Sequence, residues 1–231
     1  MITDIAAHEL GERPVLMNGQ MVRATRAGLK KNTRRVALGR VVECFDFVGG
    51  GADGEPATKE SVGQGWFNGV FKIWIDEYPE EGSIEITTPY ARPGETLWVR
   101  ETCFDVRPHR GFPKFEGISA NWLYRADYDE DEQRSVIGCQ PWTPSIHMPR
   151  EAARILLNVV SVHLERLQEI TEEGAKAEGV QITDELTGCS DDIRDHRHAF
   201  QLVWDGLYGA GAWDENPVVW VTEFRVLEGL A

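Results

Sequence analysis

The sequence predicts a protein of the α+β class, with a mixed or barrel-like sheet and a few separate helices. Short runs of aromatic or β-branched residues with partial alternation recur along the chain and are typical of strands. Helical spacing of apolar residues is confined to a few segments, so the strand–helix alternation of a doubly wound sheet is missing. A chain of 231 residues, 42% of them hydrophobic, can bury one substantial core. We therefore expect residues 1–231 to form a single domain with insertions.

The first part of the chain predicts one helix between two strands. Residues 13–17 form a short candidate strand, and Asn18 can cap a helix that Gly28 ends. Residues 33–47 are rich in β-branched side chains and predict a second strand. The glycine-rich segment 49–58 predicts a flexible hairpin tip rather than a phosphate-binding loop, because no Lys-Ser/Thr pair follows it.

The remaining chain predicts five more strands and two helices. Three alternating aromatic runs predict strands at residues 71–75, 96–100 and 121–125. The almost continuously aliphatic residues 155–164 predict a buried strand, and a short acidic helix is expected over 171–178. Apolar spacing predicts a helix over 194–208, and residues 217–227 predict the last strand.

Charge is distributed unevenly along the chain. The formal net charge of −14 argues against a protein that coats nucleic acid non-specifically. Residues 14–42 nevertheless contain no Asp or Glu and hold seven cations, Arg23, Arg26, Lys30, Lys31, Arg34, Arg35 and Arg40. This asymmetry predicts a positive potential over one site and a small or single-stranded anionic ligand. A solvated basic helix face is the alternative explanation.

Cellular location is indicated by what the sequence lacks. No apolar run reaches the length of a membrane helix, and the first residues do not resemble a signal peptide, so we expect a cytoplasmic protein with no membrane partner. The cysteines are dispersed singly, at positions Cys44, Cys103, Cys139 and Cys189. This spacing predicts reduced thiols rather than a zinc site or a disulfide framework.

Three other clusters of polar residues predict no chemistry. The acidic residues 127–132 lack the glycine of a calcium loop and predict a solvated loop. His196 and His198 point in two directions on a helix, so no metal site is expected there. Ser145 and His147 lie between prolines, which predicts a structural crossing rather than a nucleophile and its base. We expect neither a metal nor another cofactor.

The most informative segment is Gly28-Leu29-Lys30-Lys31-Asn32-Thr33-Arg34-Arg35. It resembles the Gly-x-Lys-x-x-(Glu/Thr)-x-Arg signature of the ASCH domain, a PUA-like β-barrel associated with RNA and modified nucleosides. Residues 93–101 and 219–224 resemble, in the same order, a strand entry and the closing strand of that family. The resemblance implies a PUA-like mixed β-barrel with flanking helices and a site that binds RNA or a modified nucleoside or nucleotide. The ligand-binding residues that it implies are Gly28, Lys31, Arg34, Arg35, Trp98, Arg100 and Glu101.

Nearly the whole chain is similar to ASCH-type proteins of tailed bacteriophages and prophages that are labelled morphogenetic proteins. The similar stretches are residues 13–16, 30–35, 97–101, 144–150, 165–167, 178–180 and 213–217. This similarity implies the cytoplasm of a bacterial host as the location, and a phage assembly accessory role as one alternative function.

A small bacterial member of the ASCH family is an amidohydrolase that removes the acetyl group from N4-acetylcytidine with a Lys, a Thr and a Glu. The resemblance implies that Lys30, Thr33 and Glu178 are the catalytic residues here, with Glu172 or Glu173 as alternatives for the carboxylate. In this scheme Thr33 attacks the amide and Lys30 takes its proton. Glu178 holds the ammonium and relays a proton to the leaving nitrogen.

Two functions therefore stay open for this site. One is hydrolysis of an N4-acylated cytosine without a metal. The other is non-catalytic binding in a basic cleft, with Lys30 and Arg35 on phosphate. The chain is longer than the small enzyme, and we expect the extra length as loop insertions at about 49–90 and 102–142.

Overall fold

The computed structural model describes residues 11–50, 54–88, 91–107, 120–138, 140–182 and 195–227. These residues form a mixed α+β structure with several sheets and few helices, as the sequence predicts. The chain divides into two compact units. The first comprises residues 1–28, 95–158 and 226–231, and the second comprises residues 29–94 and 159–225.

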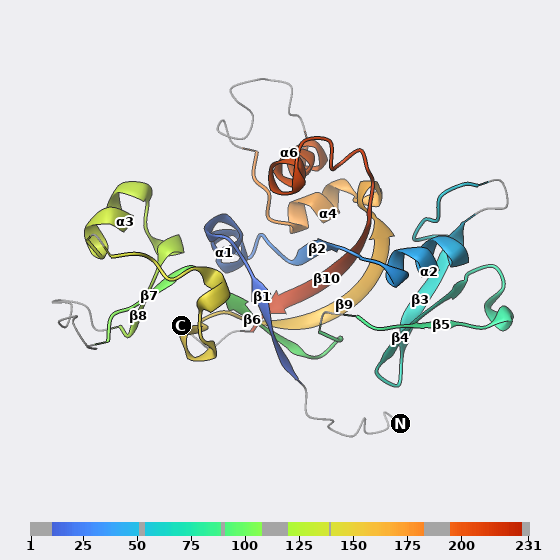
Figure 1. The fold of residues 1–231 in the computed structure, drawn as a ribbon, viewed down its shortest axis with the longest axis horizontal. Coiled ribbons are helices and arrows are strands. Elements are labelled where there is room, and N and C mark those ends of the chain that lie inside the picture. Colours follow the sequence, from blue (N-terminus) through green and yellow to red (C-terminus); the bar gives the residue numbers. More distant parts are fainter. Residues whose placement is uncertain are drawn as a thin grey trace. The chain divides into compact units, whose positions relative to one another are not determined.

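A five-stranded sheet has the strand order β1-β6-β9-β10-β2 (Figure 1). Its strands are β1 (Glu12–Leu16), β2 (Asn32–Val36), β6 (Thr96–Arg100), β9 (Leu156–Arg166) and β10 (Val218–Val226). In the first unit β6 pairs parallel with β1 and antiparallel with the start of β9. In the second unit β2 pairs antiparallel with β10.

The predicted barrel is not closed within the described residues. A closed barrel requires every strand to pair on both sides, whereas β1 and β2 each have a single neighbour in the strand order. The sheet is therefore open over the part of the chain that the structure describes.

The first unit carries helix α1 (Gly19–Arg26) and a small two-stranded sheet. The Asn18 side chain accepts a hydrogen bond from the Met21 N–H, and Gly28 has a positive φ of 72°, so both predicted helix boundaries are confirmed. Strands β7 (Cys103–Asp105) and β8 (Trp122–Tyr124) pair antiparallel. Their apolar side chains pack with Ile137 at the end of helix α3 (Glu130–Val136).

Helix α3 corrects the prediction of a solvated loop at 127–132. Asp129 and Glu132 form a capping box, in which each side chain accepts a hydrogen bond from the other residue's backbone N–H. Acidic residues are favourable in a first helical turn, so this cluster begins a helix.

The second unit contains an antiparallel sheet of β3 (Val62–Phe67), β4 (Val70–Ile75) and β5 (Ile84–Ile86). β3 and β4 are joined at Asn68 and Gly69, which both have positive φ, as the tightest hairpin turns require. The sequence predicts a loop insertion at about 49–90 with one strand at 71–75. The structure has three paired strands between Val62 and Ile86 instead.

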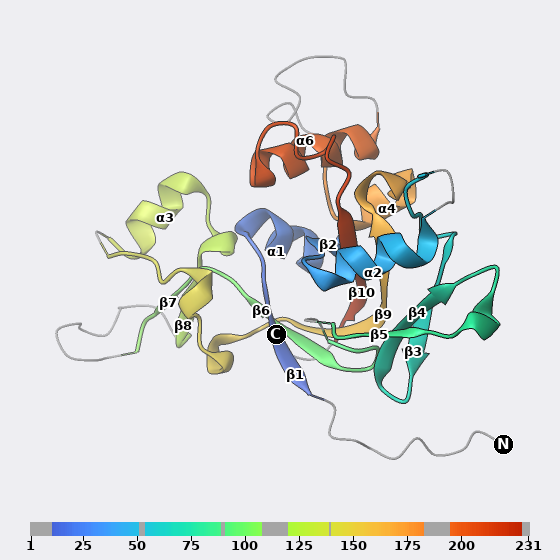
Figure 2. The same cartoon turned by 45° about the vertical axis from the view of Figure 1, so that its right-hand side comes forward.

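Helix α2 (Arg40–Gly49) corrects the prediction of one strand over 33–47. The strand β2 ends at Val36, and Gly39 adopts a φ of 55° that interrupts extended backbone. Phe45 and Val48 lie three residues apart on one helical face and are buried, and the helix packs against β3 and β4 (Figure 2). Because a helix precedes the segment 49–58, the prediction of a hairpin tip between two strands is wrong; residues 51–53 of that segment lie outside the described residues.

Helices α4 (Glu172–Ala177) and α6 (His196–Tyr208) cover one face of β10 in the second unit (Figure 1). Thr171 and Asp195 cap their N-termini, each by accepting a backbone N–H. The buried core of this face consists of Leu167, Ile170, Ala175, Phe200, Trp204, Trp213, Val219 and Val221. The predicted helices and the closing strand are confirmed.

Candidate functional site

The Lys30–Arg35 part of the motif runs as extended backbone beside the C-terminal end of α4. The Lys31 N–H donates to the Ala177 carbonyl at 2.7 Å, and the Lys31 carbonyl accepts from the Phe224 N–H at 2.8 Å. A β-bridge joins Lys30 to Glu178. The motif is therefore held on one side by β10 and on the other by the end of α4.

Lys30 and Glu178 form a buried ion pair, although 148 residues separate them. The Lys30 Nζ lies 2.7 Å from Glu178 Oε2 and 3.0 Å from the Glu178 carbonyl oxygen. Lys30 is 1% exposed. An ammonium so far from water requires such partners, because an unpaired buried charge is costly.

Arg34 extends this pair into a network of alternating charge. Its Nη1 lies 3.1 Å from Glu178 Oε1, and its Nε lies 2.8 Å from Glu165 Oε1. All four side chains are buried. Glu178 is thus bound by two buried cations, and Glu165 is bound by Arg34.

Two further groups approach Glu165 from the partly exposed side. His163 Nε2 lies 3.4 Å and Lys59 Nζ 3.9 Å from Glu165 Oε2. Burial by itself would raise the pKa of Glu165, but hydrogen bonds from His163 and Arg34 and the Arg34 charge hold this pKa below its usual value. Glu165 is therefore an anion in the folded protein at neutral pH.

Asn32 lies between Lys30 and Arg34 on the same side of the strand. Its Nδ2 donates to the Gly174 carbonyl at 3.3 Å. Its Oδ1 is buried and has no hydrogen-bond partner within the described residues. Neither Asn32 nor Glu165 is among the site residues predicted from the sequence. The spacing of Lys30, Asn32 and Arg34 at every second residue could have indicated Asn32, because such residues share one face of a strand.

Thr33 lies on the opposite face of the sheet from Lys30, Asn32 and Arg34. Successive side chains of a strand point to opposite faces, and Thr33 pairs in register with Thr222 of β10. Trp220, two residues from Thr222 on the same face, packs edge to face on Phe71 of β4, with ring centroids 5.1 Å apart. The structure therefore brings Lys30, Arg34 and Glu178 together but places Thr33 away from them.

The alternative carboxylates of α4 do not take the place of Glu178. Glu172 accepts hydrogen bonds from the His196 and Arg197 backbone N–H groups, at 3.1 Å each, and contacts His196 Nδ1 at 2.8 Å. Desolvation opposes these bonds, but together they lower the pKa of Glu172 to about 2. Glu173 is exposed.

The remaining predicted ligand residues belong to the first unit, apart from Lys31 and Arg35. Trp98 is buried, with the guanidinium carbons of Arg100 and Arg150 5.1 and 5.8 Å from its ring centre. Glu101 is also buried, and Arg154 binds both of its oxygens at 2.8 and 2.9 Å. Its carboxylate is thus already engaged. Gly28 follows the last turn of α1.

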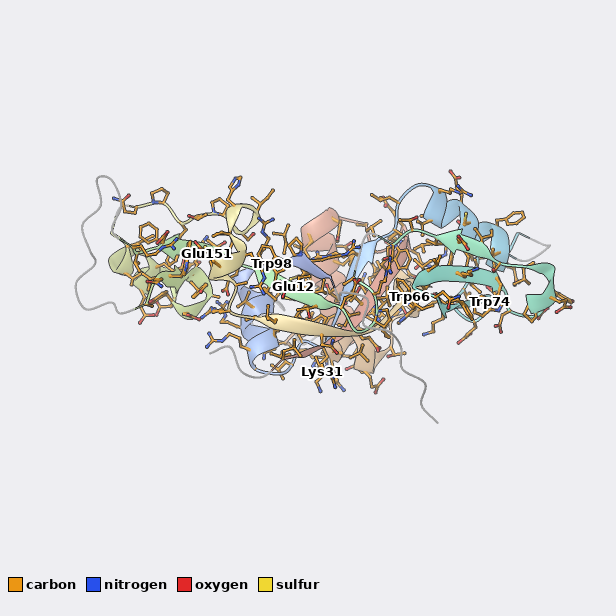
Figure 3. All side chains as sticks on the ribbon, turned by 90° about the horizontal axis from the view of Figure 1, so that it is seen from below. Glu12, Lys31, Trp66, Trp74, Trp98 and Glu151 are labelled. Carbon is orange, nitrogen blue, oxygen red and sulfur yellow. The ribbon has the colours of Figure 1, made fainter. Side chains whose placement is uncertain are left out.

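The predicted single basic face is wrong for part of the acid-free stretch. Lys30 and Arg34 are buried and ion-paired, and Arg26 contacts Asp127 at 2.6 Å. Lys31 keeps an exposed side chain (Figure 3). Arg35 is half-buried and pairs in register with Trp220. Two of the four cations of the motif, Lys30 and Arg34, are therefore internal charges.

The remaining candidates, a metal site, the Ser145–His147 pair and the cysteines, do not form a reactive site in the part of the chain that the structure describes. Across the described residues, no group of three His, Cys, Asp or Glu could hold a metal ion. Ser145 and His147 lie in one 3-10 turn, where His147 is exposed. Cys103 is a free thiol whose pKa is raised to about 11 by burial and by the carboxylates of Glu101 and Asp105. Cys139 and Cys189 lie outside the described residues.

Three comparisons with known proteins found no relative of this chain. No family profile, no curated protein and no solved structure matches this chain. None of the helices in the described ranges has both the length and the apolar character needed to cross a bilayer. The site must therefore be interpreted from its own geometry and from the motif.

Proposed function

We propose that this chain is an ASCH-type, PUA-like module that binds single-stranded RNA or a modified nucleoside without cleaving it. The observation that supports this proposal is the 2.7 Å contact between Lys30 and Glu178. The motif resemblance pairs these two residues in one site, and the fold joins them across a long stretch of sequence.

Binding without cleavage is favoured by the position of Thr33. A hydroxyl nucleophile must lie within hydrogen-bond reach of its base, whereas Thr33 and Lys30 lie on opposite faces of the strand. Lys30 also donates to both the carboxylate and the carbonyl of Glu178. A general base requires a free lone pair on nitrogen, which an ammonium held in this way lacks.

The ligand contact that we propose lies at the exposed edge of this network. The Lys31 N–H is bonded to the carbonyl of Ala177, the residue that follows Lys176 in α4. The Lys31 side chain is exposed, and that of Lys176 is 52% exposed, with its Nζ 3.6 Å from Glu172 Oε1. Two exposed ammonium groups at one edge are suited to phosphate oxygens.

The test is the affinity of the full chain for a fluorescent single-stranded RNA, measured by anisotropy from about 50 to about 200 mM salt. We expect the double variant Lys31→Ala, Lys176→Ala to bind the RNA more weakly than the wild type. The slope of log affinity against log salt concentration should be shallower by about 1.4, since each phosphate contact on a single strand contributes about 0.7. Arg13→Gln is the matched control, because Arg13 is exposed and belongs to the other unit. Absence of RNA binding at the lowest salt, or an unchanged slope in the double variant, would overturn the proposal.

Hydrolysis of an N4-acylated cytosine is the second candidate, because the resemblance that implies it places Lys30 and Glu178 in one site and the two side chains are in contact. The position of Thr33 on the other face of the strand argues against it. The assay follows loss of the acetyl group from N4-acetylcytidine incubated with the pure protein. If the wild type releases the acetyl group and Thr33→Val does not, the function of this site is catalysis and the proposal of binding without cleavage is wrong.

A further inference from the structure

The outer face of the β3–β4–β5 sheet presents aromatic side chains to solvent. The register of the hairpin places Gly63, Gly65 and Phe67 of β3 on this face. Lys72 and Trp74 of β4 lie on it too, whereas Phe71 and Ile73 of β4 are buried on the other face.

Two glycines hold the Trp74 ring flat against the sheet. A Cβ atom at Gly63 would lie 2.0 Å from Trp74 Nε1, so the indole occupies the space of the missing side chain. At Gly65 a Cβ would contact Phe67 at 3.4 Å and Trp74 at 3.6 Å. The Phe67 and Trp74 rings are themselves in edge-to-face contact, 5.7 Å apart. The two rings therefore hold one another in place on this face. Trp74 is labelled in Figure 3.

A hollow of about 430 Å³ lies beside these rings. It is lined by Phe67, Lys72, Trp74, Pro79, Gly82 and Ser83. The 3-10 turn at Pro79–Glu81 and the following Gly82, with a φ of 108°, form one wall. We call this hollow the aromatic groove.

Charge around the aromatic groove is negative. Residues 62–87 contain five carboxylate residues and a single lysine. That lysine, Lys72, is paired with Glu85 at 3.1 Å. Asp76, Glu77 and Glu80 are exposed. This surface would repel a polyanion and attract a cation.

We propose that the aromatic groove binds an extended, arginine-containing segment of a partner protein. A guanidinium can stack on the Trp74 ring, which lines the groove, because aromatic rings attract cations through the negative charge of their faces. The acidic rim supplies carboxylates for further arginines. The aliphatic stem of the arginine packs on Phe67, which is 50% exposed. This site is separate from the Lys30–Glu178 network and does not depend on the function proposed there.

The experiment uses the full chain and three fluorescent octapeptides in which glycine alternates with arginine, glutamine or glutamate. We expect saturable anisotropy binding of the arginine peptide and much weaker binding of the other two. Trp74→Ala should weaken the arginine peptide about tenfold, and Trp74→Leu should do the same while keeping apolar volume. Phe47→Ala is the matched control, since Phe47 is an exposed aromatic on α2 in the same unit and does not line the groove. Circular dichroism of each variant checks that it is folded.

Three results would overturn the proposal. They are equal binding of the arginine and glutamate peptides, wild-type affinity in the folded Trp74 variants, and loss of single-stranded RNA binding in the folded Trp74 variants. The last result would assign the aromatic groove to nucleic acid instead.

Discussion

The Nζ atom of Lys30 lies 2.7 Å from Oε2 of Glu178, and both side chains are buried. Arg34 binds the other oxygen of the same carboxylate at 3.1 Å. Because one carboxylate neutralises parts of two buried cations, this contact links β2 to the end of α4. Removing the charge of Glu178 leaves Lys30 without a countercharge in a region that excludes water, and leaves Arg34 with Glu165 alone.

Stability should depend strongly on Glu178. We expect Glu178→Gln to lower the free energy of unfolding by about 3 kcal/mol, because Lys30 and Arg34 would then lack one countercharge. Urea titration followed by circular dichroism measures the change. Glu173→Gln serves as the control, since Glu173 lies on the same helix and is exposed, and its effect should stay within about 0.5 kcal/mol. Equal effects of the two substitutions would contradict a stabilising role for the buried network.

A side chain at Gly63 should disturb the hairpin. Gly63→Ala would place a methyl group 2.0 Å from Trp74 Nε1, and displacing the indole should cost about 1 to 3 kcal/mol. Gly206→Ala is the opposite case, because a Cβ there meets no atom within 4 Å and the residue lies inside α6. We expect that substitution to stabilise the protein by about 0.5 to 1 kcal/mol. Thermal unfolding of both variants tests the pair, and stabilisation by Gly63→Ala would disprove the close packing of Trp74.

Acid sensitivity should be reduced in Glu172→Gln. The pKa of Glu172 is about 2 in the folded protein against 4.5 ordinarily, so the unfolded chain takes up a proton first as pH falls. The stabilisation from its hydrogen bonds is complete above about pH 5 and is lost as pH falls toward about 2. We therefore expect the wild type to lose more unfolding free energy than Glu172→Gln over this range. In Glu173→Gln the loss should parallel the wild type, and parallel curves for all three proteins would refute the assignment.

Thr33 should be dispensable for ligand binding. Thr33→Val keeps the shape of the side chain and removes its hydroxyl on the face of β2 away from Lys30. We expect RNA affinity in the anisotropy assay to change less than about twofold, because no charged hydrogen bond is lost. Lys31→Ala, measured in parallel, should weaken binding. A large loss in Thr33→Val alone would place the ligand on the other face of the sheet.

Local signals in the sequence determined most of the elements but not all of their boundaries. The cap at Asn18, the stop at Gly28 and the acidic helix after Ile170 were predicted because capping and periodicity act within one or two turns. Of the strand predicted over 33–47, residues 33–36 are confirmed in β2, whereas residues 40–47 belong to α2, because the burial of Phe45 and Val48 on one face favours a helix there.

The sequence by itself determined the α+β class and the motif from Gly28 to Arg35. The resemblance of that motif implied that Lys30 meets Glu178, with Glu172 or Glu173 as alternatives, and the structure shows the contact with Glu178. The tertiary structure alone decided that Thr33 faces away from Lys30, that Glu165 completes the buried network and that Arg34 is internal rather than part of a basic face. The physical reason is strand register: a shift of one residue exchanges the two faces of a strand, and the register of β2 is set by its pairing with β10, whose sequence lies far along the chain.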